Sequence, residues 1–441
     1  MKILDLVIKI LLIVCLFCSI IMLLPGSILL DINPKIYRTR LPKSLKQFHS
    51  IDSIQIDQFV SIDLLDSGAE SIAFYEDKLV LGSSDGTIYQ LINNTVKRLI
   101  KIESDENQII KNKYSGTLGL KFDSKGSLYV VKPNYGIYRI DKLFNQQHRE
   151  APEAKLIFDI DQTIKLGHSS KFFNDIAIEE RPDGQVILYV TDVSGKFTLT
   201  EFRMIILGSD TSGRLLRYEV ETGKLDCLVD NLFYPNGIEI SKDQSILLFS
   251  EFGTRSLWKY RLNAIDSKPE QIMYNLPAEI DNIRISPVGP ETYWLAMLRP
   301  RSLYNQSELD YLMRKPLLRK LILRTFHLIG SILELISRLI SNDYLEKIAI
   351  DFKTVQGNHI LGSVLYNDHD DTLIDENRDN GGMLIECDQN GKILNSIYTN
   401  QCDRLAAVSE VREIPSDRID RRTLYLASYS LPIVRKMIIS I

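Results

Sequence analysis

The chain has 441 residues, of which 44% are hydrophobic and 25% are charged. This composition is ordinary for a globular protein and excludes a disordered chain, a fibrous repeat and a membrane protein with many spans. The 53 basic and 57 acidic side chains give a formal net charge of −4, which argues against a nucleic-acid-binding protein. Five widely spaced cysteines indicate neither a disulfide framework nor a zinc motif.

The N-terminal residues differ from the rest of the chain in composition. Residues 7–24 are apolar apart from one lysine and one serine. Such a run is about long enough to cross a bilayer as one helix. The sequence therefore predicts a transmembrane signal anchor over residues 1–30, followed by a linker over residues 31–50. A cleaved signal peptide, processed near residues 25–27, is the alternative.

The residues leave the orientation of this anchor open. Five basic side chains follow the apolar run within residues 35–46, and the positive-inside rule would keep that side in the cytosol. In contrast, Asn93 and Asn305 each begin an acceptor pattern for N-glycosylation, which is useful only in a lumenal or extracellular domain.

From residue 51 onward, an apolar strand, a turn and a second strand recur about every sixty residues. Turn residues separate the strands, with almost no helical periodicity between them. Six such units predict an all-β fold, a six-bladed β-propeller over residues 51–441, with two β-sandwiches as the alternative. Residues 53–65 are expected to close the ring by adding an outer strand to the last blade. The predicted opening strands are residues 70–74, 118–122, 174–178, 236–240 and 281–285, with a looser match near 405–411.

One segment breaks this pattern, an inserted amphipathic helix at about residues 305–350. Between residues 316 and 340, apolar side chains recur at spacings of three and four, opposite a narrow polar side, and a proline marks the first turn. This helix either packs over the propeller or lies at a membrane surface, where its basic excess suits anionic lipid. Residues 366–380, rich in aspartate, are expected to form a solvated loop. The apolar side consists of Leu318, Ile322, Phe326, Ile329, Leu333, Ile336 and Ile340.

The residues that open the innermost strands offer oxygen atoms. In a propeller these strands begin near the central channel on one face, and four units place Glu70, Asn174, Asn236 and Asp281 there, with Asn282 next to the last of them. Carboxylate and amide oxygens without cysteine or histidine suit a hard cation, and calcium takes six to eight of them. The sequence therefore predicts a shared calcium (Ca2+) site. Turn capping by asparagine and aspartate is the alternative.

Six stretches occur in the order and at the separations of a known family: residues 70–73, 173–175, 189–192, 210–216, 234–237 and 281–284. On these stretches the chain resembles the strictosidine synthase-like branch of the six-bladed calcium propellers. The resemblance implies a single-pass anchor with the propeller lumenal or extracellular, at the plasma membrane or the endoplasmic reticulum. It also implies that Glu70, Asn174, Asn236 and Asp281 match the family's calcium ligands, with Asn282 adjacent.

Two departures from the family bear on catalysis. Paraoxonase-type relatives carry a catalytic histidine where this chain has Leu118, so a histidine-assisted lactonase is not expected. Strictosidine synthases use a glutamate near the start of the last blade, where this chain has Glu410 or, with a shift of one residue, Ser409. Glu410 is thus the candidate catalytic residue, although amine–aldehyde condensation is not expected.

Two functions follow from this pattern. The first is a calcium-dependent hydrolase of arylesterase type, acting on small apolar or aromatic esters, in which calcium polarises the carbonyl group. The second is a membrane-tethered binding or adhesion glycoprotein in which calcium is structural. In both, the N-terminal helix is expected to contact the membrane, joined by the helix at residues 316–340 if that helix is interfacial.

Overall fold

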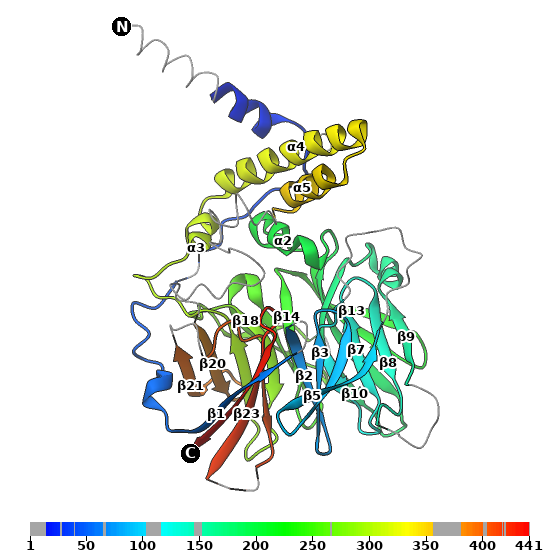
Figure 1. Cartoon of the computed structure of the whole chain (residues 1–441), viewed down its shortest axis with the longest axis vertical. Helices are drawn as coiled ribbons and strands as arrows, with labels where there is room; N and C mark the ends of the chain where they lie inside the picture. Colours follow the sequence, from blue (N-terminus) through cyan, green and yellow to red (C-terminus); the bar gives the residue numbers. More distant parts are fainter. Residues whose placement is uncertain are drawn as a thin grey trace. The chain divides into compact units, whose positions relative to one another are not determined.

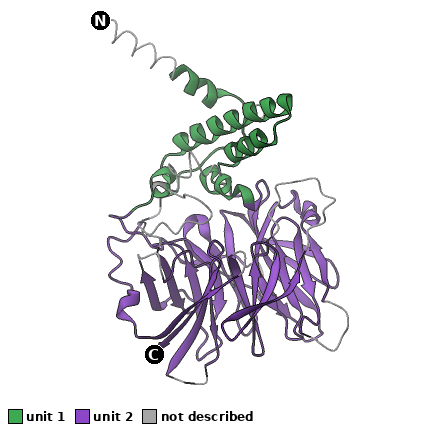
Figure 2. Ribbon diagram, in the orientation of Figure 1, with its two compact units in different colours: residues 1–38, 200–210, 306–373 green, residues 39–199, 211–305, 374–441 purple. Residues whose placement is uncertain are grey.

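The computed structural model describes residues 15–26, 29–38, 40–64, 68–102, 116–144, 152–264, 267–355, 381–399, 404–416, 418 and 420–440. The chain falls into two compact units, shown in different colours in Figure 2. The first, which is helical, is made of residues 1–38, 200–210 and 306–373. The second, which consists of strands, is made of residues 39–199, 211–305 and 374–441.

The strand unit consists of six four-stranded sheets in which every neighbouring pair of strands is antiparallel (Figure 1). In five of these sheets the strands pair in chain order. The first two of the five comprise β2 (Ala69–Tyr75), β3 (Lys78–Ser83), β4 (Thr87–Ile92) and β5 (Thr95–Lys101), then β6 (Leu120–Phe122), β7 (Leu128–Lys132), β8 (Gly136–Ile140) and β9 (Ala154–Asp159). The third comprises β10 (Phe172–Glu180), β11 (Val186–Ser194), β12 (Gly213–Glu219) and β13 (Leu225–Leu232). The last two comprise β14 (Pro235–Ile240), β15 (Ile246–Glu251), β16 (Ser256–Arg261) and β17 (Glu270–Met273), then β18 (Ile280–Ile285), β19 (Tyr293–Met297), β20 (Gly382–Cys387) and β21 (Ile393–Thr399).

The sixth sheet joins the two ends of the strand unit. It orders β22 (Glu410–Ile414), β23 (Arg421–Ala427) and β24 (Ile433–Ser440), and then β1 (Ile56–Asp63) as the outer strand. β1 pairs antiparallel with β24, in register from Gln58 opposite Ile438 to Asp63 opposite Ile433. The predicted closing strand is therefore confirmed.

The innermost strands form a closed ring. β2, β6, β10, β14, β18 and β22 each contact the next strand in this series, and β22 contacts β2. The unit is thus a six-bladed propeller, and the alternative of two β-sandwiches is wrong. Two glycines permit the close approach at the axis, since a Cβ on Gly237 would lie 2.6 Å from the Asp281 carbonyl oxygen. A Cβ on Gly119 would lie 2.4 Å from the Asp175 carboxylate.

Apolar clusters between neighbouring blades hold the ring together. The second strand of several blades is buried along its whole length, as in β11, β15 and β19. One cluster combines Met437 and Leu424 of the last blade with Trp294 and Leu384 of the blade before it. Because such strands are covered on both faces, each contains a continuous apolar run of four or more residues. This is the pattern from which the second strand of each unit was recognised.

The helical unit contains the predicted inserted helix at the predicted bounds, α4 (Pro316–Ile340). It is flanked by α3 (Glu308–Met313), which starts with a capping box, and by α5 (Asp343–Thr354), so the described part of the insertion holds three helices instead of the one expected. The sequence did not predict α2 (Phe202–Gly208), which interrupts a blade between β11 and β12. The structure also contains four short 3-10 helices, Ile51–Ser53, Ile160–Leu166, Leu199–Glu201 and Phe252–Thr254.

The predicted anchor lies partly outside the described residues, which begin at residue 15. Residues 15–23 are helical. Within the described part of the chain, no helix combines the length and apolar character needed to cross a membrane. The predicted aspartate-rich loop, residues 366–380, also lies outside the described residues.

The predicted apolar side of α4 is only partly covered by described residues of the helical unit. Arg319 and Arg324 are buried, whereas Leu318, Ile336 and Ile340 of the predicted apolar side are exposed. Both expectations for this helix, packing over the propeller and contact with a membrane surface, stay predictions. Periodicity locates a helix, but contacts with other segments decide which side is covered.

Ring closure by the C-terminal strand yields a first prediction. Met437 in β24 is fully buried between the last two blades, so Met437→Ala removes packing on both sides. We expect a loss of about 2–5 kcal/mol in the free energy of unfolding. Urea denaturation of the full chain in detergent measures this loss. The neighbouring Lys436→Ala is expected to cost less than about 1 kcal/mol, because its side chain is only half-buried. Equal effects of the two changes would contradict closure through β24.

Candidate metal centre

Three of the residues proposed as calcium ligands occupy equivalent positions in three blades, and the other two lie one position further along their strands. Glu70, Asn236 and Asp281 are the second residues of β2, β14 and β18, while Asn174 is the third residue of β10 and Asn282 the third of β18. All five are buried, with at most 7% of the residue exposed. Each therefore lies at the start of an innermost strand, where the blades converge.

Hydrogen bonds and charge interactions join four of these side chains. The Asn282 amide donates a hydrogen bond to Glu70 Oε1 at 2.8 Å. The Asn236 amide hydrogen-bonds with the Asp281 carboxylate, and the charge of Asp281 in turn acts on Glu70. Asn174 stands on β10, which contacts β14. The fold thus brings together residues that are far apart in the sequence.

Four oxygen atoms of this group have no hydrogen-bond partner among the described residues. They are buried and belong to four of the five side chains: Glu70 Oε2, Asn174 Oδ1, Asn236 Oδ1 and Asn282 Oδ1. Buried polar atoms in native proteins almost always have a partner, and leaving one unsatisfied costs about 1–3 kcal/mol. A hard cation would satisfy all four at once. The donor set therefore fits calcium.

The charge of the site also favours a divalent cation. Glu70 and Asp281 form no ion pair with any described residue. Burial, together with the negative charges of Asp281, Asp175 and Glu410, raises the pKa of Glu70 well above its usual value. Burial also raises the pKa of Asp281 to about 7, despite the hydrogen bond from Asn236, which lowers it. Two buried carboxylates without a cationic partner match the charge of one divalent cation.

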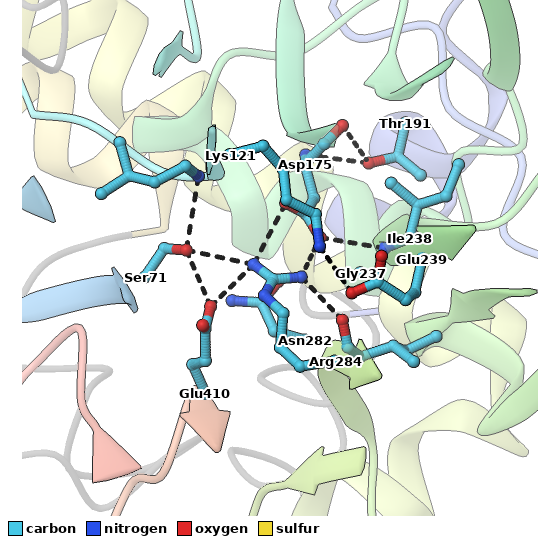
Figure 3. Close-up of polar contacts among 12 residues, drawn as sticks. Ser71, Lys121, Asp175, Thr191, Gly237, Ile238, Glu239, Asn282, Arg284 and Glu410 are labelled. Carbon is cyan, nitrogen blue, oxygen red and sulfur yellow. Dashed lines mark hydrogen bonds and ion pairs between the residues drawn. The ribbon is translucent and has the colours of Figure 1, made fainter. Parts of the chain in front are cut away.

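A second layer of charged side chains lies on the same strands and is fully paired (Figure 3). Arg284 of β18 is completely buried and donates to both oxygens of Asp175, at 2.7 and 3.2 Å. Its Nη2, which makes the longer of these two bonds, also lies 2.7 Å from Glu410 Oε2 and 3.0 Å from Ser71 Oγ. This one guanidinium group therefore links four blades, those that begin with β2, β10, β18 and β22.

The remaining charged side chains of this layer are paired too. Lys121 of β6 forms an ion pair with Glu239 of β14, and Arg412 lies 3.2 Å from Glu410. With Arg284 and Asp175, the layer then holds three cations and three anions. We call these six residues, with Ser71, the axial network. Because its charges balance, none of its cations is left over for Glu70 and Asp281.

The candidate catalytic residue Glu410 belongs to the axial network. Its carboxylate accepts a hydrogen bond from Ser71 at 2.7 Å and is completely buried between Arg284 and Arg412. A carboxylate held by two guanidinium groups has a structural role, which does not favour Glu410 as the catalytic residue. Ser409, its neighbour, donates a hydrogen bond to the Glu70 carbonyl oxygen at 3.0 Å and so supports the ligand set.

Other predicted site residues lie on the surface. Asn93 is exposed in the turn between β4 and β5, and Asn305 is also exposed. Both asparagines are therefore accessible, and their glycosylation stays a prediction. In the described part of the chain no cluster of three or more histidine, cysteine, aspartate or glutamate side chains could hold a metal ion. The proposed set does not depend on such a cluster, because it has two carboxylates and three amides.

Residues 174–265 match the family model described as strictosidine synthase, a range that includes Asn174 and Asn236. Together with the fold, this match supports the resemblance found in the sequence: the chain is similar to the strictosidine synthase-like propellers.

Curated relatives agree with this class. The adipocyte plasma membrane-associated protein of Bos taurus is 29% identical over 262 residues, which cover 59% of this chain and 60% of that protein. The Homo sapiens protein of the same name is 27% identical over 266 residues, with the same coverage. Protein strictosidine synthase-like 10 of Arabidopsis thaliana is 28% identical over 207 residues, which cover 45% of this chain and 51% of that protein. The chain thus matches about three fifths of the length of the animal relatives.

Solved structures show weaker similarity. A luciferin-regenerating enzyme has a TM-score of 0.47 at 11% identity, covering 87% of this chain and 98% of that protein. Regucalcin from Agrobacterium tumefaciens, a calcium-binding protein, has a TM-score of 0.37 at 13% identity, covering 55% and 72%. At these values neither structure bears on the ligand or activity of this chain.

The raised pKa values of Glu70 and Asp281 yield a second prediction. Carboxyl groups in the unfolded chain lose their protons near pH 4, whereas these two keep theirs longer in the metal-free folded state. Their contribution to stability is therefore lost as the pH rises from about 4 to about 7. Calcium replaces the protons, so the increase in Tm on adding calcium should be larger at pH 8 than at pH 5. Calorimetry of the full chain with calcium and with chelator measures this increase.

A matched pair of variants controls this measurement. Asn236→Ala removes one unpartnered oxygen and should abolish most of the calcium-dependent increase in Tm. Asn305→Ala changes an exposed asparagine and should leave the increase intact. An increase that is absent at every pH, or largest at pH 5, would contradict the assignment of these carboxylates as calcium ligands.

The axial network yields a third prediction. Arg284→Met leaves Asp175 and Glu410 buried without their shared cation. We expect the free energy of unfolding to fall by about 3–5 kcal/mol. Arg139→Met, which breaks a partly exposed ion pair with Asp141, should cost less than about 1 kcal/mol. Urea denaturation with calcium present compares the two, and a loss for Arg284→Met no larger than for Arg139→Met would refute the role of the network.

Proposed function

We propose that the chain is a membrane-anchored, calcium-dependent hydrolase of arylesterase type. The observation that carries this proposal is the group of four buried oxygen atoms without hydrogen-bond partners, beside two buried carboxylates without a cation. Glu70, Asn174, Asn236, Asp281 and Asn282 would hold the ion. Five side chains leave one to three of calcium's six to eight positions for water and the carbonyl oxygen of an ester.

Each part of the site has a task in ester hydrolysis. When bound, calcium supplies Lewis-acid polarisation of the carbonyl group and stabilises the developing oxyanion. Glu70 Oε2, which has no partner among the described residues, can take a proton from the attacking water. The hydroxyl adds to the carbonyl carbon, the bond to the aryl oxygen breaks, and the departing phenolate takes up the proton. The products are a carboxylic acid and a phenol.

Membrane residence is part of the same proposal. The apolar run of residues 7–24 supports an N-terminal anchor, and the matched animal proteins are named as associated with the plasma membrane. The exposed acceptor asparagines Asn93 and Asn305 support a lumenal or extracellular propeller. A chain of this kind would act on apolar esters near a lipid surface, at the plasma membrane or the endoplasmic reticulum.

A binding or adhesion glycoprotein with structural calcium is the second candidate. Two observations favour it. Leu118 is 4% exposed and apolar at the position of the paraoxonase-type histidine, and Glu410 is held within the axial network. A scaffold of this kind can keep its ion without a residue for proton transfer at those two positions. Strictosidine synthase activity is not proposed, because Glu410 lacks a free oxygen for it.

A fourth prediction separates the two candidates. The full chain in detergent with calcium should hydrolyse phenyl acetate, lose this activity with chelator and regain it when calcium returns. Asn236→Ala should lower kcat/KM at least about 100-fold, because even outer-shell changes at metal sites cost 10–100-fold. Asn305→Ala should have no effect. Calcium-dependent Tm without turnover on ester, lactone or phosphotriester substrates would refute the hydrolase and leave the binding role.

A further inference from the structure

Helix α4 presents an apolar surface that the described residues of the helical unit leave uncovered. Seven of its leucine and isoleucine residues are between 38% and 76% exposed. With 3.6 residues per turn they share one arc of about 140° on the helix. Exposed apolar surface of this kind marks a site of association with a membrane or another protein. The seven residues, which we call the α4 apolar face, are Leu317, Leu318, Ile332, Leu335, Ile336, Leu339 and Ile340.

Two buried arginines hold the polar side of α4 inward. Arg319 donates to the Leu207 carbonyl oxygen and to Ser209 Oγ, both at 2.8 Å, and to the Lys35 carbonyl oxygen. Arg324 donates to carbonyl oxygens of the N-terminal segment. Turning the helix over would break all of these bonds and leave the accepting carbonyl oxygens without these donors. The exposure of the apolar face is therefore enforced by the structure.

Helix α5 packs against the side of α4 away from the apolar face. A Cβ on Gly330 would lie 2.6 Å from the Ala349 carbonyl oxygen, so only glycine allows this close approach. Phe326 stacks on Phe352 with ring centroids 5.5 Å apart. These contacts, like those of the arginines, do not involve the apolar face.

Two observations identify a lipid bilayer as the occupant of this face. Arg324 bonds to the carbonyl oxygens of Ile21, Met22 and Leu24, at 2.7–3.1 Å, which lie at the end of the apolar run proposed as the anchor. Within the same unit, Leu16, Phe17, Ile20 and Leu23 are 48–83% exposed. The α4 apolar face is therefore tied directly to the segment that would leave the membrane.

The second observation is charge. Arg314, Lys315 and Arg338 are exposed on or beside α4, and Glu334, the acidic residue of the helix, already bonds to Arg338 and Lys353. Basic side chains beside an apolar face suit the anionic headgroups of a bilayer. We propose that the α4 apolar face lies in the headgroup–acyl boundary of an anionic bilayer, as a second, in-plane attachment. The inference rests on the proposed membrane residence, but neither on calcium nor on hydrolysis.

An added tryptophan tests this contact. The chain has two tryptophans, Trp258 and Trp294, both in the propeller, so the unaltered chain gives the baseline fluorescence. Leu335→Trp adds one on the apolar face, where the residue is 60% exposed and the larger ring fits, and Glu346→Trp adds one on exposed α5. The full-length variants are placed in vesicles of phosphatidylserine and phosphatidylcholine brominated in the acyl chains. Leu335→Trp should lose at least about twice the fraction of added fluorescence that Glu346→Trp loses, since such helices insert 5–10 Å.

The other results overturn the inference in distinguishable ways. If the protein does not float with vesicles in a density gradient, both membrane residence and this contact fail. If it floats but the two variants are quenched equally, the anchor stands and the in-plane contact fails. If Leu335→Trp is not quenched and a dimer in detergent dissociates on Leu335→Asp with Leu339→Asp, the face binds a second copy of the chain. Ile332→Trp, at 50% exposure, repeats the test on the same face.

Discussion

Charge must be neutralised where the six innermost strands converge, because the charged side chains there are buried. Arg284 meets this constraint for the axial network by bonding to Asp175, Glu410 and Ser71 from three other blades. Removing one partner from such a buried pair is strongly destabilising. The ring and its charges therefore depend on each other: the blades place the side chains, and the ion pairs hold the blades.

The same constraint gives neighbouring residues of one strand different roles, either in the axial network or in the proposed metal site. Asp175 and Arg284 belong to the neutral axial network, whereas Asn174 and Asn282, one and two residues before them, present oxygens without partners. Successive side chains of a strand point to opposite sides, which separates Asn174 from Asp175. In β18 the pairing is irregular between Ile280 and Ile283, just before Arg284. The excess negative charge at Glu70 and Asp281 marks the layer that a cation would neutralise, which is why the proposed chemistry is located there.

The helical unit follows the reverse arrangement. In the propeller, apolar side chains fill the spaces between blades; in α4, buried arginines bond to carbonyl oxygens and leucines face outward. Carbonyl groups outside regular structure need donors, and long guanidinium side chains supply several at once. An outward apolar face is stable where the surroundings are apolar, so this arrangement and the proposed lipid contact explain each other.

Local pattern sufficed for much of this protein. Alternation and turn residues gave the six blades and the closing strand, spacing gave the bounds of α4, and equivalent strand starts gave the five candidate ligands. Each of these features depends on residues that are close together in the sequence. The short helix α2 was missed, because seven residues are too few for a periodic signal.

Tertiary structure alone decided the rest. The partners of Arg284 are residues 71, 175 and 410, which are far apart in the sequence, so no local spacing reveals them. The polar and charged residues within 282–284 and 410–412, in predicted innermost strands, were a signal of a buried polar network. The covered side of α4 was likewise set by carbonyl groups of distant segments. Hydrophobic period reports which residues share a face, but whether that face is buried depends on what the remaining chain brings to it.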